Sequence, residues 1–383
     1  MSAELDFGLS EEQRLLRDEI RRFAEERIRP GVAERDRERR FPSRIVVEMG
    51  EMGLLGMLVA DQYGGAGFDP LSYVIAVEEL ARVCPSTAVT MSVSNSVCCW
   101  PIAHFGSEDL KQRVLPELAS GRMIGGFGLT ESGSGSDAGS LTTRAELDGD
   151  NWVLNGEKAW ITNAGEAGVY VVMAKTDPEA GKRGITALVV PADAPGLSVG
   201  TPEAKMGLKA SRTAPLLFEN CRVRADNVLG EVGAGFKIAL RTLDHSRLGI
   251  AAQAVGIHQR ALELAVEYAR ARVQFGVPIA SHQAIQFKIA TMATELEAAR
   301  ALTRVAAAGE HRSRGALLAS EAKLFASESA NRACYESLQI HGGNGFSDEY
   351  EISRLYRDVR VTTIYEGTSE MQRWVIARHL TRA

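Results

Sequence analysis

The sequence lacks the cysteine and histidine patterns that mark disulfide-rich or metal-binding proteins. Its five cysteines (Cys84, Cys98, Cys99, Cys221 and Cys334) are odd in number and form no Cys-x-x-Cys pair. We therefore expect all five to be reduced, buried side chains. The seven histidines include no His-Glu-x-x-His motif or comparable cluster, so the sequence predicts no metal site.

Long apolar runs and an excess of positive charge are also missing. No apolar run reaches the roughly 18 residues of a membrane span, and the acidic, polar N-terminus (MSAELDFGLSEEQ) is unlike a signal or transit peptide. The formal net charge of -5 argues against a general nucleic-acid-binding surface, so local cations would have to meet any polyanionic ligand. We expect a cytoplasmic protein that binds neither membranes nor nucleic acids.

What the sequence does contain is an ordinary globular composition. It has 383 residues, of which 45% are hydrophobic and 24% charged, enough for two or three domains and a large core. The hydrophobic period changes twice along the chain. The patterns predict an α+β protein with an all-α domain over 1–122, a small β domain (barrel or sandwich) over 123–230, and a C-terminal four-helix bundle over 231–383.

Helical patterns fill the first of these segments. Ser10 and Gln13 have the spacing of a capping box, ahead of a helix that is expected to end near Pro30. Further helices are expected over 71–83, 86–105 and 107–119, and the mixed charges of 35–40 are expected to form a solvated face. The glycine-rich stretch 63–67 lacks the context of a phosphate-binding loop, so we interpret it as an ordinary loop.

Short β-type runs and then long amphipathic runs follow. The sequence predicts strands over 152–154, 159–161, 169–174, 185–190 and 215–218, with a hairpin turn at Asn155-Gly156 between the first two. Long helices are predicted over 236–273, 282–308 and 315–340, with a final helix after Gly367, and four helices of this kind suggest a bundle. Gly342 and Gly343 are the expected stop of the third long helix.

Three stretches carry residue types suited to chemistry. Phe127 to Asp137 (FGLTESGSGSD) offers hydroxyls and accessible backbone N–H groups for a polar ring edge and a phosphate, although such a run is also typical of a flexible loop. In Lys158 to Asn163 (KAWITN), a Trp beside a Thr can cover a planar ring, or it can be core. Ile364 to Glu370 (IYEGTSE) places a glutamate before a glycine and a helix that Thr368 or Ser369 could cap, or it is merely a surface carboxylate.

Together these stretches resemble the acyl-CoA dehydrogenase family, whose patterns read approximately LTEPGAGSD, WITN and YEGT. The resemblance covers essentially the whole chain in the right order. One departure is Ser132, which stands where the family usually has proline, so a less rigid loop is expected. The pattern is nearest the short-chain (butyryl-CoA) type, with the isobutyryl type as a close competitor. Val93 and Trp100, placed by resemblance near the floor of the acyl pocket, favour a short straight or branched chain.

The resemblance implies FAD as the cofactor and a homotetramer (dimer of dimers) in which neighbouring subunits share each FAD. Arginine suits the pyrophosphate because its planar fork binds two oxygens. The implied acyl-CoA contacts are Ser136, Asp244, Arg247, Tyr365 and Gly367. The implied FAD contacts are Phe127, Leu129, Thr130, Gly135, Ser136, Trp160, Ile161, Thr162, Arg272, Phe275, Gln283, Gln339, Ile340, Gly342, Gly343, Thr368, Ser369 and Glu370.

The reaction implied by the resemblance is the α,β-dehydrogenation of an acyl-CoA to the trans-2-enoyl-CoA. Glu366 would remove the α-proton, the flavin N5 would accept the β-hydride, and electrons would pass to an electron-transferring flavoprotein. The Glu366 N–H and a ribityl hydroxyl would act like an oxyanion hole, and burial should raise the pKa of Glu366. Some family branches place the base immediately before the arginine matched by Arg247, but Ser246 stands there and cannot be a carboxylate base.

Three alternatives to a dehydrogenase remain. An acyl-CoA oxidase would use oxygen as its acceptor, but such oxidases usually carry a further C-terminal domain, whereas this chain stops at Ala383. A nitroalkane oxidase would use an aspartate base, whereas this chain has Glu366. A non-catalytic CoA-ester-binding homologue would be expected to lack the base or the flavin, and the purified protein would then be colourless.

Overall fold

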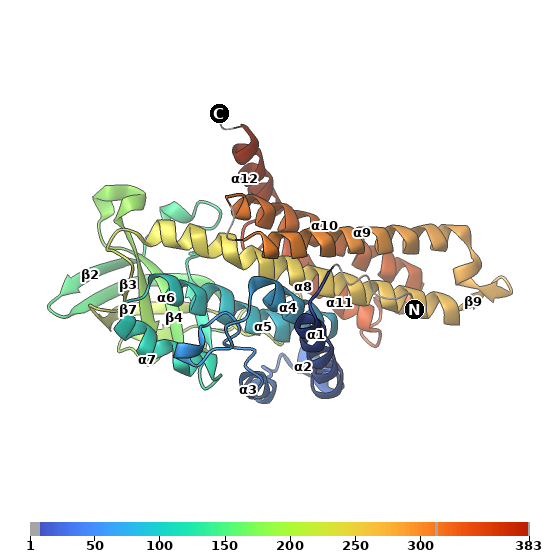
Figure 1. The fold of residues 1–383 in the computed structure, drawn as a ribbon, viewed down its shortest axis with the longest axis horizontal. Helices are drawn as coiled ribbons and strands as arrows, with labels where there is room; N and C mark the ends of the chain where they lie inside the picture. The colour runs from blue at the N-terminus through green and yellow to red at the C-terminus, as the bar shows by residue number, and fades with distance from the viewer. Residues whose placement is uncertain (1–7, 311–312, 382–383) are drawn as a thin grey trace.

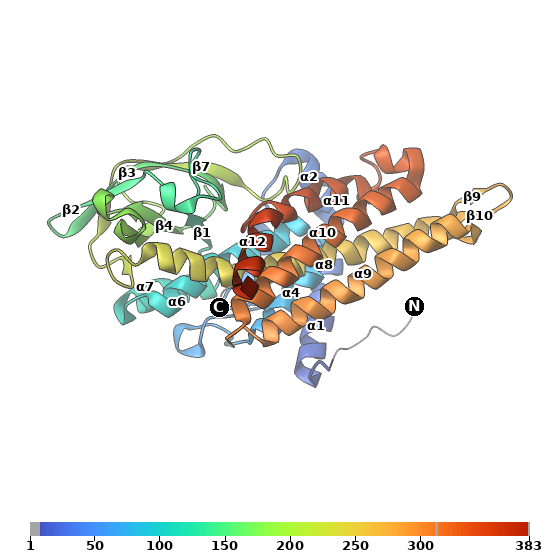
Figure 2. The same ribbon diagram turned by 90° about the horizontal axis from the view of Figure 1, so that it is seen from above.

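The computed structural model describes residues 8–310 and 313–381 and shows a helical N-terminal part, a sheet in the middle and a helical C-terminal part. Figure 1 shows an elongated molecule with the sheet at one end and the short β9–β10 hairpin at the other. The long helices α8 and α9 run along its length, and α12 projects from its side. The view from above in Figure 2 keeps the sheet and the hairpin at opposite ends.

The N-terminal part consists of short helices packed around α4 and α5. Ser10 and Gln13 form both halves of the predicted capping box, and Ser107 caps α7. The predicted solvated face over 35–40 is wrong in part: Arg35 is buried and donates to the Ile28 carbonyl, and Asp36 is buried against Arg357. The helices are α1 (Glu11–Phe23), α2 (Val32–Glu38), α3 (Ser43–Glu51), α4 (Pro70–Val83), α5 (Pro85–Val93), α6 (Trp100–Phe105) and α7 (Glu108–Ala119), with π-helical turns at Ala24–Ile28 and Ser94–Cys99.

The middle part is one mixed sheet with the strand order β6-β7-β3-β2-β4-β5-β8, in which β1 also pairs with β4. The predicted hairpin turn at Asn155-Gly156 is wrong, because β3 runs straight through it. Gly156 instead marks a register shift against β7, and a Cβ there would lie 2.8 Å from the Thr143 Cα. The strands are β1 (Gly125–Gly128), β2 (Arg144–Asp148), β3 (Asn151–Thr162), β4 (Val169–Lys175), β5 (Ile185–Pro191), β6 (Leu197–Val199), β7 (Thr213–Arg224) and β8 (Val228–Leu229).

The C-terminal part is built on three long helices, as predicted. Helix α8 begins against β4 and β5 and then runs into the bundle, so the sheet and the bundle share one rigid element. Helix α4 from the N-terminal part packs on α8 and α9, whereas α12 packs on α10 (Figure 1). The elements are α8 (Gly235–Ala271), β9 (Val273–Gln274), β10 (Val277–Pro278), α9 (Gln283–Ala308), α10 (Gly315–His341), α11 (Glu351–Val359) and α12 (Ser369–Thr381).

Three expectations drawn from absences can be compared with the described residues. All five cysteines are free and buried, as expected. Within 8–310 and 313–381, no helix is long and apolar enough to cross a membrane. In the same part of the chain, no cluster of three or more His, Cys, Asp or Glu side chains could hold a metal ion.

Candidate active site

Two consecutive residues with left-handed backbone conformations form the turn that carries the candidate base. Glu366 has φ 54° and Gly367 has φ 91°. Left-handed φ is uncommon for a residue with a side chain and is found most often where the surroundings impose it. The turn leads into α12, and Thr368 caps that helix because its Oγ1 accepts the Met371 N–H at 3.3 Å. Thr368, rather than Ser369, is therefore the cap.

The carboxylate of Glu366 contacts a helix that is distant in sequence. The Ser246 hydroxyl of α8 donates to Glu366 Oε2. Part of the Glu366 residue is accessible to solvent, but protein atoms surround its carboxylate. The carboxylate therefore loses hydration, which raises the pKa of Glu366. The Ser246 hydrogen bond and the positive charges of Arg247 and Lys323 act in the opposite direction. The predicted direction of the pKa shift is thus confirmed, and the structure adds three groups that limit it.

The polar group at 244–247 lies on α8 beside the same turn. Arg247 is buried and donates to Asp244 Oδ1 at 2.6 Å and to Ser320 Oγ at 3.1 Å. The positive charge of Arg247 is close enough to Glu366 to lower the pKa of that carboxylate. His245 points elsewhere: it hydrogen-bonds Glu310 and stacks on Trp100 with ring centroids 4.9 Å apart. The structure therefore brings Ser246, from 120 residues away, and the charge of Arg247 to Glu366, whereas Asp244 is joined to this group through Arg247.

The Ser/Gly-rich loop, which comprises residues 127–137, is anchored by a buried ion pair that the sequence did not indicate. Glu131 accepts hydrogen bonds from the backbone N–H and hydroxyl groups of both Thr142 and Thr143, and the Lys158 ammonium lies 2.7 Å from its Oε1. These donors and the lysine charge lower the pKa of Glu131 to about 2, against the effect of burial. Lys158 also donates to the Leu129 carbonyl, so the pair fixes the backbone on both sides of Thr130.

Next to this anchor lies a surface suited to a planar ring. Trp160 is 59% exposed and has φ 61°, so it is not the core residue that a Trp in a strand usually is. Ile161 beneath it is buried and Thr162 is half-buried. A Cβ added at Gly133 or Gly135 would have no heavy atom of the described residues within 4 Å, so the loop backbone there is open to a ligand. Exposed indole and accessible N–H groups fit an isoalloxazine and a phosphate, which supports the residues proposed for FAD.

A small apolar cluster links this surface to Glu366. Phe127 of β1 and Tyr365, the residue before the candidate base, both pack against it. Val93, predicted near the floor of the acyl pocket, is one of its members, whereas Trp100 stacks on His104 and His245 instead. The buried members are Val89, Val93, Val97 and Leu208, with Val361 also packed against them.

Seven of the residues predicted to bind FAD lie far from Trp160 within one chain. Arg272, Phe275 and Gln283 belong to the hairpin region at the opposite end of the molecule from the sheet (Figures 1 and 2). Phe275 is 95% exposed. The other four residues of this group, Gln339, Ile340, Gly342 and Gly343, lie at the end of α10, where Gly342 has φ 58°. One chain does not bring these groups to the Ser/Gly-rich loop, so they could contact an FAD bound there only from a second chain.

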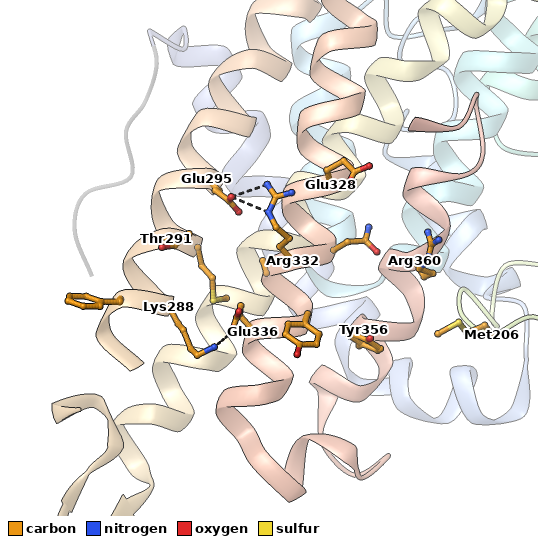
Figure 3. A pocket seen from close by; sticks show the side chains of 14 residues that line it. Met206, Lys288, Thr291, Glu295, Glu328, Arg332, Glu336, Tyr356 and Arg360 are labelled. Atoms are coloured by element: carbon orange, nitrogen blue, oxygen red, sulfur yellow. Dashed lines mark hydrogen bonds and ion pairs between the residues drawn. The ribbon is translucent and has the colours of Figure 1, made fainter. Parts of the chain in front are cut away.

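The α9–α10 groove, defined by its lining residues, is a separate hollow on the bundle (Figure 3). It has a volume of about 550 Å³. Arg332 of α10 reaches Glu295 of α9 at 2.9 Å, and Lys288 pairs with Glu336 (Figure 3). The lining residues are Met206, Phe287, Lys288, Thr291, Met292, Glu295, Glu328, Asn331, Arg332, Ala333, Tyr335, Glu336, Tyr356 and Arg360.

Comparison with known proteins agrees with this architecture over almost the whole chain. The chain matches the acyl-CoA dehydrogenase N-terminal domain over 10–122, the middle domain over 126–221 and the C-terminal domain over 233–381. The mitochondrial short-chain specific acyl-CoA dehydrogenase of Homo sapiens is 50% identical over 98% of this chain and 91% of its own length.

Solved structures give the same result. Butyryl-CoA dehydrogenase from Megasphaera elsdenii has a TM-score of 0.96 at 42% identity, covering 99% of this chain and all of that one. An acyl-CoA dehydrogenase from Bacillus anthracis in complex with FAD has a TM-score of 0.92 at 35% identity, covering 97% of this chain and 67% of that one. The chain described here therefore belongs to the acyl-CoA dehydrogenase family, a group of FAD-containing oxidoreductases.

Proposed function

We propose that this acyl-CoA dehydrogenase converts a short-chain acyl-CoA, straight or branched, to the trans-2-enoyl-CoA with Glu366 as the base. The observation that carries the proposal is the placement of Glu366. Glu366 lies in a turn with left-handed backbone conformation, accepts a hydrogen bond from Ser246 and is close to two buried cations. The apolar cluster around Val93 packs against the preceding residue, Tyr365. This arrangement allows a carboxylate to face an acyl carbon while staying ionised.

The chain's own residues would act as follows. Glu366 takes the α-proton, and its raised pKa brings it nearer the working pH, which makes it a stronger base than an exposed glutamate. Its backbone N–H is proposed to donate to the thioester oxygen, where negative charge develops as the proton leaves. Asp244 and Arg247 are proposed to hold the polar part of the acyl-CoA, together with Ser136, Tyr365 and Gly367.

FAD, when bound, supplies the acceptor for the hydride that leaves the β-carbon. The residues proposed to hold it within the chain are Phe127, Leu129, Thr130, Gly135 and Ser136 of the loop, and Trp160, Ile161 and Thr162 of β3. Ser369 fits a polar ligand as well, because its hydroxyl is buried and has no hydrogen-bond partner among the described residues. Thr368 and Glu370, which flank Ser369, complete the residues proposed to bind FAD within the same chain.

We further propose a homotetramer, because FAD contacts at the hairpin and at the end of α10 need a second chain. The apolar side chains exposed along this part of the bundle support self-association. Phe287 of the α9–α10 groove is 62% exposed and Tyr335 is 54% exposed. A cytoplasmic location, domain limits at 1–122, 123–230 and 231–383, and an electron-transferring flavoprotein as the electron acceptor also remain proposals.

The test of the proposed base is Glu366→Gln, a substitution that keeps the side-chain shape and removes the carboxylate. We expect FAD content and acyl-CoA binding to persist while turnover of butyryl-CoA with a dye acceptor falls by a factor of about 10²–10⁴ or more. Turnover close to that of the unaltered enzyme would refute the assignment of the base.

Two further assays identify the acceptor and the substrate. Oxygen uptake with and without an electron-transferring flavoprotein separates an oxidase from a dehydrogenase. A panel of C4 to C16 and branched CoA esters determines the chain length.

A further inference from the structure

The two left-handed residues of the base turn are held by side chains from two different helices. Gln372 of α12 donates through its Nε2 to the Glu366 carbonyl at 3.2 Å and to the Gly367 carbonyl at 2.8 Å. The Lys323 ammonium of α10 donates to the same Gly367 carbonyl at 2.8 Å. Both holding side chains are fully buried. Both carbonyls of the turn are therefore fixed by groups that cannot move into solvent.

Packing alone does not explain a lysine at position 323. A buried ammonium loses its hydration, so an apolar side chain of similar length would fill this place in the bundle at lower cost. Burial indeed lowers the pKa of Lys323 to about 7, and the charge of Arg247 lowers it too, whereas Glu366 raises it. Glu366 thus favours the charged form of the lysine against the effect of burial, while the Lys323 Nζ donates to the turn that carries that carboxylate.

The geometry points to Lys323 and Gln372 as a clamp that positions the catalytic base. The clamp fixes the planes of the two peptides that follow the Glu366 Cα, Glu366–Gly367 through Gln372 and Gly367–Thr368 through both side chains, and so holds the backbone from which the Glu366 carboxylate projects. Lys323 and Gln372 are positioning residues, because both donate to backbone carbonyls of the turn and neither is proposed to contact the substrate. The inference rests on the proposed role of Glu366. The charged groups that face Lys323 are Glu366, Arg247, Glu328 and Glu370. The negative charge of Glu366 also raises the pKa of the phenols of Tyr73 and Tyr365.

The test replaces the clamp and reads the position of the base. Lys323→Met removes the donor and keeps the bulk, and Lys323→Arg keeps a charged donor. Lys237→Met, at an exposed lysine on α8, is the matched control. With butyryl-CoA and a dye acceptor, we expect Lys323→Met to lower kcat by about 10²-fold, because a small misplacement of a catalytic group has effects of that size. KM and FAD content should change little, Lys323→Arg should recover part of kcat, and Lys237→Met should match the unaltered enzyme.

A second readout separates misplacement from damage to the fold. With α-deuterated butyryl-CoA, the isotope effect on kcat should rise in Lys323→Met, because proton removal becomes slower while other steps do not. Gln372→Leu, on a different helix, should give the same pattern, and it decides the matter if Lys323→Met does not fold.

Two outcomes would overturn the clamp. Unchanged kcat and isotope effect in the folded variants, with Glu366→Gln inactive, would overturn it and leave Glu366 as the base. An active Glu366→Gln would overturn the base and, with it, the clamp.

Discussion

The hydrogen bond from Ser246 to Glu366 gives the sharpest prediction about pH dependence. A hydroxyl donates more strongly to an ionised carboxylate than to a protonated carboxyl group, so the bond favours the ionised form and lowers the pKa of Glu366. Burial is the larger effect and raises the pKa of Glu366. Ser246→Ala removes the hydroxyl and with it part of what counteracts burial. The pKa of Glu366 should therefore rise further above its ordinary value, and the acidic limb of kcat/KM should move to higher pH.

The expected size of this shift follows from the strength of such bonds. A hydrogen bond to a charged group contributes roughly 1.5–3 kcal/mol, and one pKa unit corresponds to about 1.4 kcal/mol. Because the half-buried carboxylate can recover some hydration, we expect the lower end, a shift of about one unit. On the acidic side of the profile the rate should then fall about tenfold, whereas the alkaline plateau should be kept within a few-fold.

The assay is the pH profile of kcat/KM for butyryl-CoA in the unaltered enzyme, in Ser246→Ala and in Ser246→Thr. The threonine variant keeps a hydroxyl and is the matched control, so its acidic limb should stay near that of the unaltered enzyme. The carboxyl stretch of Glu366 in infrared spectra, assigned by its loss in Glu366→Gln, reports the same titration without turnover. An acidic limb that does not move in Ser246→Ala would refute the reasoning.

Three other regions of the molecule give further predictions. Trp160→Ala should change the free energy of unfolding of the FAD-free protein by no more than about 0.5 kcal/mol, because the side chain is exposed, yet it should speed the loss of FAD on dilution; equal retention of FAD would contradict the proposed ring surface. Lys158→Met should destabilise the protein by about 3–5 kcal/mol, measured by urea unfolding, because it leaves Glu131 buried without its cation. The pKa of Glu131, about 2 in the folded protein against 4.5 otherwise, makes its contribution to stability present above pH 4.5 and lost as the pH falls towards 2; Glu131→Gln should weaken that acid dependence, and an unchanged slope would exclude Glu131 as its source. Phe287→Glu should lower the molecular mass measured by light scattering if the α9–α10 groove takes part in self-association, and a tetramer of full mass would remove that surface from the interface.

The sequence was sufficient for most of the helical architecture. The long helices follow from amphipathic runs whose ends carry local signals, such as the glycines after His341 and the serine caps. The strands were less predictable. Asn155-Gly156 has the residue types of a hairpin turn, but β3 continues because it pairs with β7 on both sides of these residues. Local turn propensity contributes less than the continuous ladder of backbone hydrogen bonds on both sides of the bulge.

The candidate site was predictable only where a motif marks it. Glu366 stands out because a glycine and a helix start follow it, whereas Lys323 lies inside a long helix where one charged residue among apolar ones has no special signal. The Glu131–Lys158 pair joins residues 27 apart on a loop and a strand, and nothing local in either stretch indicates the other. Arg35 was misjudged for the same reason, since its burial depends on a distant segment of the chain.

The charges around Glu366 suit the proposed role of this half-buried carboxylate as a base. Glu366 lies near two cationic side chains, Arg247 and Lys323, and Asp244 accepts a hydrogen bond from Arg247. An isolated buried carboxylate would take up a proton and lose its function, whereas one fully paired with a cation would bind that cation too tightly to attack a weak acid. Here neither cation contacts the carboxylate directly: Arg247 donates to Asp244, and Lys323 donates to the Gly367 carbonyl. The cations therefore favour the ionised form of Glu366 through space. Among the described residues neither carboxylate oxygen forms a salt bridge, which suits the proposed removal of a weakly acidic proton.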